Sequence, residues 1–208
     1  EEAIQFIDCS ANMLLHQQGL EIFCKGNADA RLSRKRVRGR VFNPAGLRLL
    51  YAFFNRPELL NLSYRKIASE AGVALGSIGP VFDDLLHSGY LAEQDQGKYL
   101  LNKKRLFERW VDAYLEKLRP SQMLGTYCVL PNDWWKSVKI TDYDMQWGGE
   151  VVIARQTPFL LPDAIAIYSH HDNIEPLLSK YQLQPDKEGN VMIYRAFWST
   201  VAGEENVN

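Results

Sequence analysis

The chain has 208 residues, of which 46% are hydrophobic and 24% are charged, and its formal net charge is -1. This composition is typical of a globular protein with room for two or three small domains, and it excludes a disordered or fibrous chain. No apolar run approaches the ~20 residues of a membrane span, and no basic leader precedes an apolar stretch, so we expect a cytoplasmic protein.

The three cysteines, Cys9, Cys24 and Cys128, are widely spaced and form no C-x-x-C pair. This spacing does not favour a zinc or redox centre, and buried free thiols in a reducing compartment fit it best. We therefore expect neither a metal nor a cofactor.

The N-terminal stretch AIQFIDCSANMLLHQQGLEIFCKG has apolar residues in short bursts with polar or glycine-containing breaks between them. The pattern predicts a small meander of three short β-strands. Three short strands bury too little surface to be stable alone. We therefore expect this piece to pack on the next domain or to complete a fold that begins upstream.

A strongly basic segment follows, RLSRKRVRGR at residues 31–40, with six positive charges and no acidic residue. We call it the basic arm and predict that it contacts DNA through Arg34, Lys35, Arg36, Arg38 and Arg40. Dense positive charge is favourable along phosphates because counterions are released, and arginine can enter a narrow minor groove. The alternative is that the basic arm is a solvated linker.

Residues 62–91 have the pattern of two helices joined by a short turn. In the first helix Ser63 is the expected N-cap and Gly72 the expected end. Its apolar face comprises Tyr64, Ile67, Ala68 and Ala71, and that of the second helix comprises Ile78, Val81, Phe82, Leu85 and Leu86. Two short helices in this order usually bind DNA as a helix-turn-helix.

Flanking elements extend this pattern. Asn43 and Pro44 mark the start of an upstream helix, and strands at residues 90–93 and 98–102 around Gly97 predict a hairpin downstream. Residues 43–104 together predict a winged helix. The alternative is a helical core with an incidental hairpin.

Further cations occur where a winged helix would meet phosphates: Arg65, Lys66, Lys98, Lys103, Lys104 and Arg105. Such contacts position a protein on DNA without reading its sequence. At the start of the second helix only Ser77 can hydrogen-bond a base edge, which predicts weak direct reading. We also expect Asp83 and Asp84 to be exposed and to repel phosphate.

The rest of the chain predicts one more helix and then a small α/β domain. The helix has Leu106, Trp110, Val111, Tyr114 and Leu118 on one face, and Pro120 stops it. The predicted fold class is α+β, in three parts. Residues 1–41 form a β-rich N-terminal piece with the basic arm, residues 42–119 a winged helix DNA-binding domain, and residues 120–208 a small C-terminal α/β domain.

Three carboxylates in the last part, Asp142, Asp144 and Glu150, lie close enough in sequence to invite comparison with the Mg²⁺ site of a nucleotidyltransferase. However, no Gly-Ser turn precedes them, and Glu150 at a helix start is explained by the helix dipole. Two adjacent histidines, His170 and His171, would point to opposite faces of a strand. We expect no catalytic metal here and no enzyme.

Four blocks of sequence, taken in order, indicate a family. They are NPAGLRLLYAFFNRPELLNLSYRKIASEAGVALGSIGPVFDDLLHSGYL, LLNKKRLFERWVDAYLEKLRP, WGGEVVIARQTPFLLPDAIAIY and QPDKEGNVMIYRAFW. The chain resembles the bacterial AbiEi-like transcriptional regulators of type IV toxin–antitoxin systems. This resemblance implies a DNA-binding antitoxin that represses its own operon and counters a nucleotidyltransferase-like toxin, its partner at the level of the gene pair.

The resemblance also carries over to particular residues. Ser63, Arg65, Lys66, Gly76, Ser77 and Gly79 occupy the family's helix-turn-helix block, and Trp147, Gly148, Gly149 and Glu150 occupy its C-terminal signature. Three functions remain in competition: a regulator that binds double-stranded DNA, a remnant nuclease or nucleotidyltransferase-type enzyme, and a winged-helix module that binds protein. Salt separates the first from the last, because phosphate-driven binding weakens steeply as salt rises.

Overall fold

The computed structural model describes residues 5–7, 12–17, 20–24, 39–131, 133–157 and 160–198. The chain divides into two compact units, Glu1–Arg38 and Gly39–Asn208. Helices and strands are both present, so the fold class is α+β, as predicted. No helix among these residues is long and apolar enough to cross a membrane.

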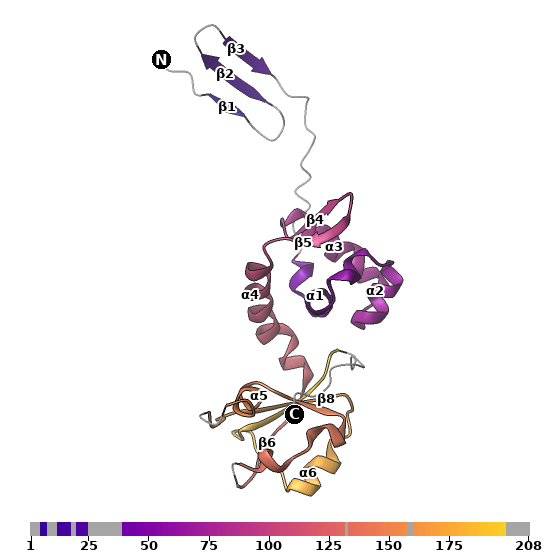
Figure 1. The fold of residues 1–208 in the computed structure, drawn as a ribbon, viewed down its shortest axis with the longest axis vertical. Helices are drawn as coiled ribbons and strands as arrows, with labels where there is room; N and C mark the ends of the chain where they lie inside the picture. Colours follow the sequence, from indigo (N-terminus) through magenta and orange to yellow (C-terminus); the bar gives the residue numbers. More distant parts are fainter. Residues whose placement is uncertain are drawn as a thin grey trace. The chain divides into compact units, whose positions relative to one another are not determined.

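The first unit contains the predicted antiparallel meander (Figure 1). Its strands are β1 (Phe6–Ile7), β2 (Met13–Gln17) and β3 (Leu20–Cys24), in the order β1-β2-β3. Cys24 is exposed and Cys128 is half-buried, so the prediction of buried thiols is wrong for Cys24. No described element of this unit covers the sheet, which leaves side chains at the end of β3 in solvent. Cys9 lies outside the described residues.

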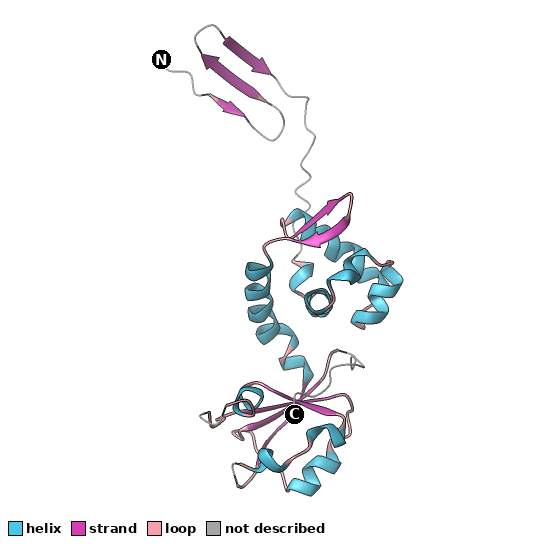
Figure 2. Cartoon of the chain, viewed as in Figure 1, coloured by secondary structure: helices cyan, strands magenta, loops and turns pink. Residues whose placement is uncertain are grey.

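The second unit begins with helices and a hairpin, shown in cyan and magenta in Figure 2. In order they are η1 (Arg40–Phe42), α1 (Pro44–Asn55), η2 (Pro57–Asn61), α2 (Tyr64–Ala71), η3 (Leu75–Ser77), α3 (Ile78–His87), β4 (Leu91–Gln94) and β5 (Gly97–Leu100). The strands of the hairpin pair antiparallel, with Leu91 opposite Leu100. Each strand is shifted or shortened by one or two residues relative to the sequence prediction.

These elements enclose a first hydrophobic core. The Asn43 side chain caps α1 by accepting a hydrogen bond of 2.8 Å from the N–H of Gly46, and Pro44 occupies the first turn, as predicted. The buried face of α1 contributes Leu47, Leu49, Leu50 and Phe53. Each large apolar side chain buried in this way stabilises the fold by about 1.5–3 kcal/mol.

The predicted helix before Pro120 forms as α4 (Lys103–Ala113) and continues as a π-helical turn, η4 (Tyr114–Leu118). A 3-10 turn, η5 (Pro120–Gln122), follows it. The indole N–H of Trp110 donates to the carbonyl oxygen of Leu47 over 2.9 Å. This hydrogen bond fixes α4 on α1 inside the first core.

The remaining residues form a five-stranded sheet with short helices. The strands are β6 (Met123–Cys128), β7 (Met145–Gly148), β8 (Ile165–Ser169), β9 (Gln184–Pro185) and β10 (Val191–Arg195), in the order β7-β8-β10-β6-β9. Among the strand pairs that the structure describes in this sheet, only β8 and β10 run parallel. The helices are η6 (Trp134–Ser137), η7 (Ile140–Tyr143), α5 (Glu150–Ala154) and α6 (Glu175–Tyr181). This mixture of strands and short helices fits the α/β character that the sequence predicts for residues 120–208.

Two glycines, Gly148 and Gly149, make the tight turn from β7 into α5. A side chain at Gly148 would overlap the ring of Tyr168, and Gly149 has a φ of 61°, in the region that favours glycine. The neighbouring Trp147 packs against Trp134, with the ring centroids 6.0 Å apart. These contacts belong to a second hydrophobic core, around the sheet.

Aromatic side chains connect the two cores. Phe197, just after β10, is buried in the first core, and its ring lies 5.1 Å from that of Tyr51 on α1. Trp198 contacts both Tyr51 and Tyr168, at 5.5 and 5.0 Å between centroids. The hydroxyls of Tyr114 and Tyr168 are hydrogen-bonded over 2.8 Å, and burial together with this bond raises the pKa of Tyr114. Tyr114 therefore stays neutral at physiological pH.

Candidate nucleic-acid interface

The first helix of the predicted pair, α2, has the caps that its sequence predicts. The Ser63 hydroxyl accepts a hydrogen bond of 3.4 Å from the N–H of Lys66. Gly72 ends the helix with a φ of 62°. Ile67, Ala68 and Ala71 are buried, which turns the polar face of α2 toward solvent.

The second helix, α3, is held against α1 and α2 by its apolar face. Ile78, Val81 and Phe82 are each at most 2% exposed, as predicted. The ring of Phe82 packs against Phe53 of α1 and Tyr64 of α2, at centroid distances of 5.6 and 5.4 Å. These contacts fix α3 on the other helices and leave Gly76 exposed and Ser77 half-buried at its start.

Two residues expected on the buried faces are largely exposed. Tyr64 is 44% and Leu86 41% exposed. Both lie in the terminal turn of their helix, where the neighbouring helix covers less of the surface. The helical period alone assigned them to the core, and the prediction is wrong for both.

The expectation that Asp84 is exposed is also wrong, because its side chain is only 9% exposed. Its carboxylate accepts a hydrogen bond of 2.6 Å from the backbone N–H of Arg40 in η1. Asp84 therefore satisfies a backbone donor at the start of the helical region and does not face solvent. Asp83 is exposed, as predicted, so a single aspartate remains on the outer face of α3.

The hairpin is fixed to η2 by the side chain of Asn61. Its Oδ1 accepts from the N–H of Lys98 over 2.7 Å, and its Nδ2 donates to the carbonyl of Lys98 over 3.1 Å. Gly97 has a φ of 110°, and any side chain there would overlap Asn61. The glycine thus permits both the turn and this close approach.

Two of the predicted cations, Lys66 and Lys98, are engaged in ion pairs. Lys98 pairs with Glu93, directly opposite it in the hairpin, over 3.1 Å. Lys66 and Arg56 both bind Glu70, at 2.9 and 2.5 Å. Hydrogen bonds from Lys66 and Arg56 lower the pKa of Glu70 to about 2. Lys66 and Lys98 therefore present less free charge than their sequence positions imply.

Other cations are exposed and form no ion pair with any described residue: Arg65 on α2, and Lys103, Lys104 and Arg105 in the first turn of α4. The first turn of α4 holds no acidic residue. Since the N-terminus of a helix carries partial positive charge, three cations there are electrostatically unfavourable unless an anion lies nearby. These four side chains form a set of cations available to phosphate.

The basic arm is described only at its end. Arg34, Lys35, Arg36 and Arg38 lie outside the described residues. Arg40 is half-buried in η1, and its backbone N–H binds Asp84. DNA contact by these five residues of the basic arm stays a prediction. The same holds for the other residues predicted to contact DNA: Ser63, Arg65, Lys66, Gly76, Ser77, Gly79, Lys98, Lys103 and Lys104.

The sequence patterns gave no role to Arg109, which the structure places beside the hairpin and η1. Its guanidinium lies 4.3 Å from the ring centroid of Phe42 and donates to the Tyr90 hydroxyl over 3.1 Å. One feature of the sequence could have indicated this role. Arg109 follows the buried Leu106 by three residues, which places it at the border of the buried face of α4. Arg109 thus joins α4 to the segments on either side of the helix pair.

The carboxylates of the last part do not gather into one site. Asp142 pairs with Lys139 over 3.2 Å, and Asp144 pairs with His171 over 2.8 Å. Glu150 accepts hydrogen bonds from the N–H groups of Asp163 and Ala164. Among the described residues no group of three histidines, cysteines or carboxylates could hold a metal ion.

Part of the chain matches a protein family model. The family model described as "Transcriptional regulator, AbiEi antitoxin, Type IV TA system" matches residues 99–208, just over half of the chain. No curated protein and no solved structure matches. The match covers α4 and the sheet and does not reach the helices α1 to α3.

Proposed function

Because the chain belongs to the AbiEi antitoxin family of transcriptional regulators from type IV toxin–antitoxin systems, we propose that it binds double-stranded DNA through a winged helix-turn-helix. In this proposal α2 and α3 are the helix pair and β4–β5 is the wing. The proposal extends the family description to residues 42–119, most of which the family match does not cover.

The observation that carries this proposal is the set of unpaired cations next to the helix pair and the hairpin. Lys103, Lys104 and Arg105 follow β5 directly, at a helix start with no acidic residue. Backbone N–H groups at a helix start also attract anions, so phosphate would remove the repulsion among these charges. A protein with a net charge of -1 needs such local clustering to bind DNA.

Base reading is assigned to the start of α3. Ser77 makes no capping hydrogen bond in α3, so its hydroxyl is available to a base edge. Asp84 is buried against the N–H of Arg40, so only one of the two carboxylates expected on the exposed face of this helix lies there. Direct reading through one hydroxyl stays weak, and we assign further affinity to the basic arm along phosphates or in a minor groove.

Three functional parts follow from this proposal: residues 1–41 with the basic arm, residues 42–119 with the winged helix, and residues 120–208 as a separate small domain. Two distinct hydrophobic cores support the division between the last two. The partner inferred from the family description, besides DNA, is a toxin at the level of the gene pair.

A protein-binding role for the same helices has one observation in its favour. Leu62, Tyr64 and Leu75 are between 42% and 48% exposed around α2 and η3. Exposed apolar side chains at one place on a surface are typical of protein contacts. Under that alternative the cations would contribute little, and binding to a partner would depend weakly on salt.

The experiment measures binding of the full chain to a labelled duplex from its own upstream region by fluorescence anisotropy at several salt concentrations. The log of affinity should fall steeply with the log of salt. Replacing both Lys103 and Lys104 by glutamine should make the slope shallower by roughly 0.9 for each phosphate that the variant no longer neutralises.

The control variant replaces Lys139 and Lys187 by glutamine, an equal charge change in the last part of the chain. This control should keep the original slope. If the two double variants behaved alike, or if the wild-type chain showed no salt dependence, the DNA-binding proposal would be wrong and the protein-binding role would be favoured.

A further inference from the structure

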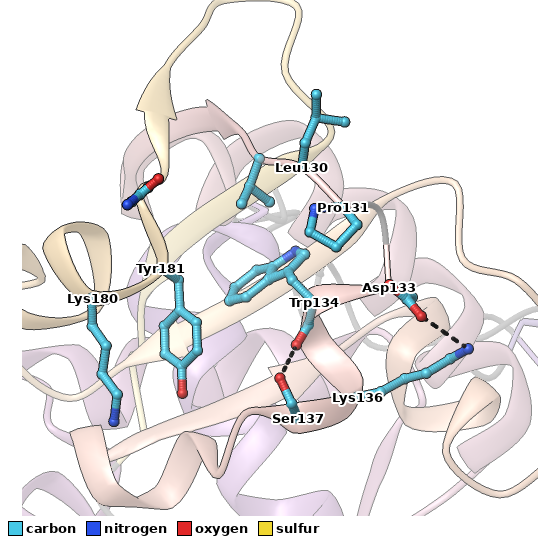
Figure 3. Close-up of a pocket in the computed structure, with 10 residues that line it drawn as sticks. Leu130, Pro131, Asp133, Trp134, Lys136, Ser137, Lys180 and Tyr181 are labelled. Carbon is cyan, nitrogen blue, oxygen red and sulfur yellow. Dashed lines mark hydrogen bonds and ion pairs between the residues drawn. The ribbon is translucent and has the colours of Figure 1, made fainter.

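A pocket lies where β6 ends, between the residues that follow this strand, η6 and the end of α6 (Figure 3). Its volume is about 410 Å³, within the range of small-molecule sites. Its lining includes Leu130, Pro131, Trp134, Lys180 and Tyr181. The proposed DNA-binding function uses none of these residues.

The wall of the pocket contains a buried hydrogen-bond donor without an acceptor. Trp134 is only 6% exposed, and its indole N–H makes no hydrogen bond with any described residue. In Figure 3 the nitrogen edge of the indole faces Pro131, which also lines the pocket. Buried polar groups nearly always have a partner, so this donor calls for an acceptor supplied from elsewhere.

Aromatic surface and positive charge accompany this donor. The rings of Trp134 and Tyr181 contact each other at 5.4 Å between centroids. Lys180 lies over the rings of Tyr181 and Tyr143, at 5.6 and 5.7 Å, and it is hydrogen-bonded to the Tyr143 hydroxyl. No ion pair joins it to a described carboxylate. The Nζ of Lys136 lies 3.8 Å from the Oδ2 of Asp133, which is a long distance for an ion pair. With two lysines and one aspartate, the lining has a net positive charge.

Leu130 adds an apolar side chain at the edge of the pocket. It is 86% exposed, the highest value among the large hydrophobic residues that the structure describes. A ligand with an apolar body in the pocket would remove part of this surface from water, which is favourable.

We propose that this pocket binds a small aromatic carboxylate. The flat ring lies against Tyr181 and Pro131 with Leu130 over it, and a carboxylate oxygen accepts the hydrogen bond from Trp134. Lys180 and Lys136 supply the positive charge that favours an anion over a neutral ligand of the same shape. The inference goes beyond the proposed DNA binding and does not depend on it.

The test uses 1-naphthoate as the probe and the full ¹⁵N-labelled chain, without DNA. The indole N–H signal of Trp134 is identified as the one that disappears in Trp134→Phe. Titration with 1-naphthoate should shift this signal, because an N–H that gains an acceptor changes its resonance. The neutral 1-naphthamide, which has the same ring, should bind about tenfold more weakly because it lacks the charge.

Variants separate this site from nonspecific binding. Lys180→Gln, at an exposed position that does not threaten the fold, should weaken 1-naphthoate binding by about tenfold. The control Lys187→Gln, in the turn before β10, should leave binding unchanged. An unmoved Trp134 signal at millimolar 1-naphthoate, equal binding of the amide, or equal weakening in both lysine variants would each overturn the proposal.

Discussion

Asp84 on α3 and Arg40 in η1, 44 positions apart in the chain, are joined by a hydrogen bond of 2.6 Å from the backbone N–H to the carboxylate. Arg40 is also the last residue of the basic arm. The bond therefore fixes the end of the arm to the helix proposed to read DNA. It also explains why an acidic residue is tolerated on that helix.

Removing this carboxylate should destabilise the fold. For Asp84→Ala we expect a decrease of about 1–3 kcal/mol in the free energy of unfolding, because the N–H of Arg40 would remain without its partner. Urea denaturation of the full chain measures this change. Asp83→Ala at the exposed neighbouring position should change stability by less than about 0.5 kcal/mol. Equal decreases in both variants would show that the Asp84 hydrogen bond contributes nothing specific.

Gly97→Ala should be strongly destabilising, by about 2 kcal/mol or more, because its backbone conformation disfavours a side chain and the new Cβ would meet Asn61. The matched control is Gly76→Ala, since nothing lies within 4 Å of a Cβ added there and its φ is not in the left-handed region. The measurement compares the free energies of unfolding of the two variants with that of wild type. A Gly97→Ala protein as stable as wild type would contradict the close contact between hairpin and η2.

Stability should fall in acid partly through Glu70. Its pKa is lowered from 4.5 to about 2 by Lys66 and Arg56. A carboxylate whose pKa is lower in the folded state stabilises the fold above its unfolded pKa, and this contribution disappears as the pH falls from 4.5 toward 2. Urea midpoints across this range should therefore depend less on pH in Glu70→Gln than in wild type.

The control for that measurement is Glu116→Gln, at an exposed carboxylate that forms no ion pair with a described residue. Its pH profile should follow that of wild type. Added salt should also narrow the difference between wild type and Glu70→Gln, because the pairs with Lys66 and Arg56 lie at the surface.

The basic arm should act on DNA of any sequence. Neutralising Arg34, Lys35, Arg36 and Arg38 together should lower affinity and make the salt slope shallower by roughly 0.9 for each phosphate left without a cation. If the arm enters a minor groove, the preference for A·T-rich flanks should fall as well. Anisotropy titrations on duplexes that differ only in their flanks measure both effects.

Ser77→Ala should behave differently from the arm variant. It should reduce discrimination between operator sequences and leave the salt slope nearly unchanged, because a hydroxyl on a base edge neutralises no phosphate. Titrations with a cognate and a scrambled duplex separate the two effects. An arm variant with wild-type affinity and slope would show instead that residues 31–40 are a solvated linker.

Local chemistry in the sequence determined where the helices begin and end. Asn43, Ser63 and Gly72 cap α1 and α2 as their residue types predict, because capping needs only neighbours within a few positions. Apart from Leu86, which is exposed, the buried face of α3 followed from the helical period for the same reason. The family resemblance also needed only the order of sequence blocks, and the family match over residues 99–208 confirms it.

Contacts between distant segments were decided only by the tertiary structure. Three examples join elements that lie many residues apart in the chain. They are the hydrogen bond between Asp84 and Arg40, the hydrogen bonds of Asn61 to the hairpin, and the pocket around Trp134. An aspartate on a helix has the same local pattern whether it faces solvent or a backbone N–H across the fold. The burial and pairing of such side chains depend on which segments pack together, and no local pattern in the sequence contains that information.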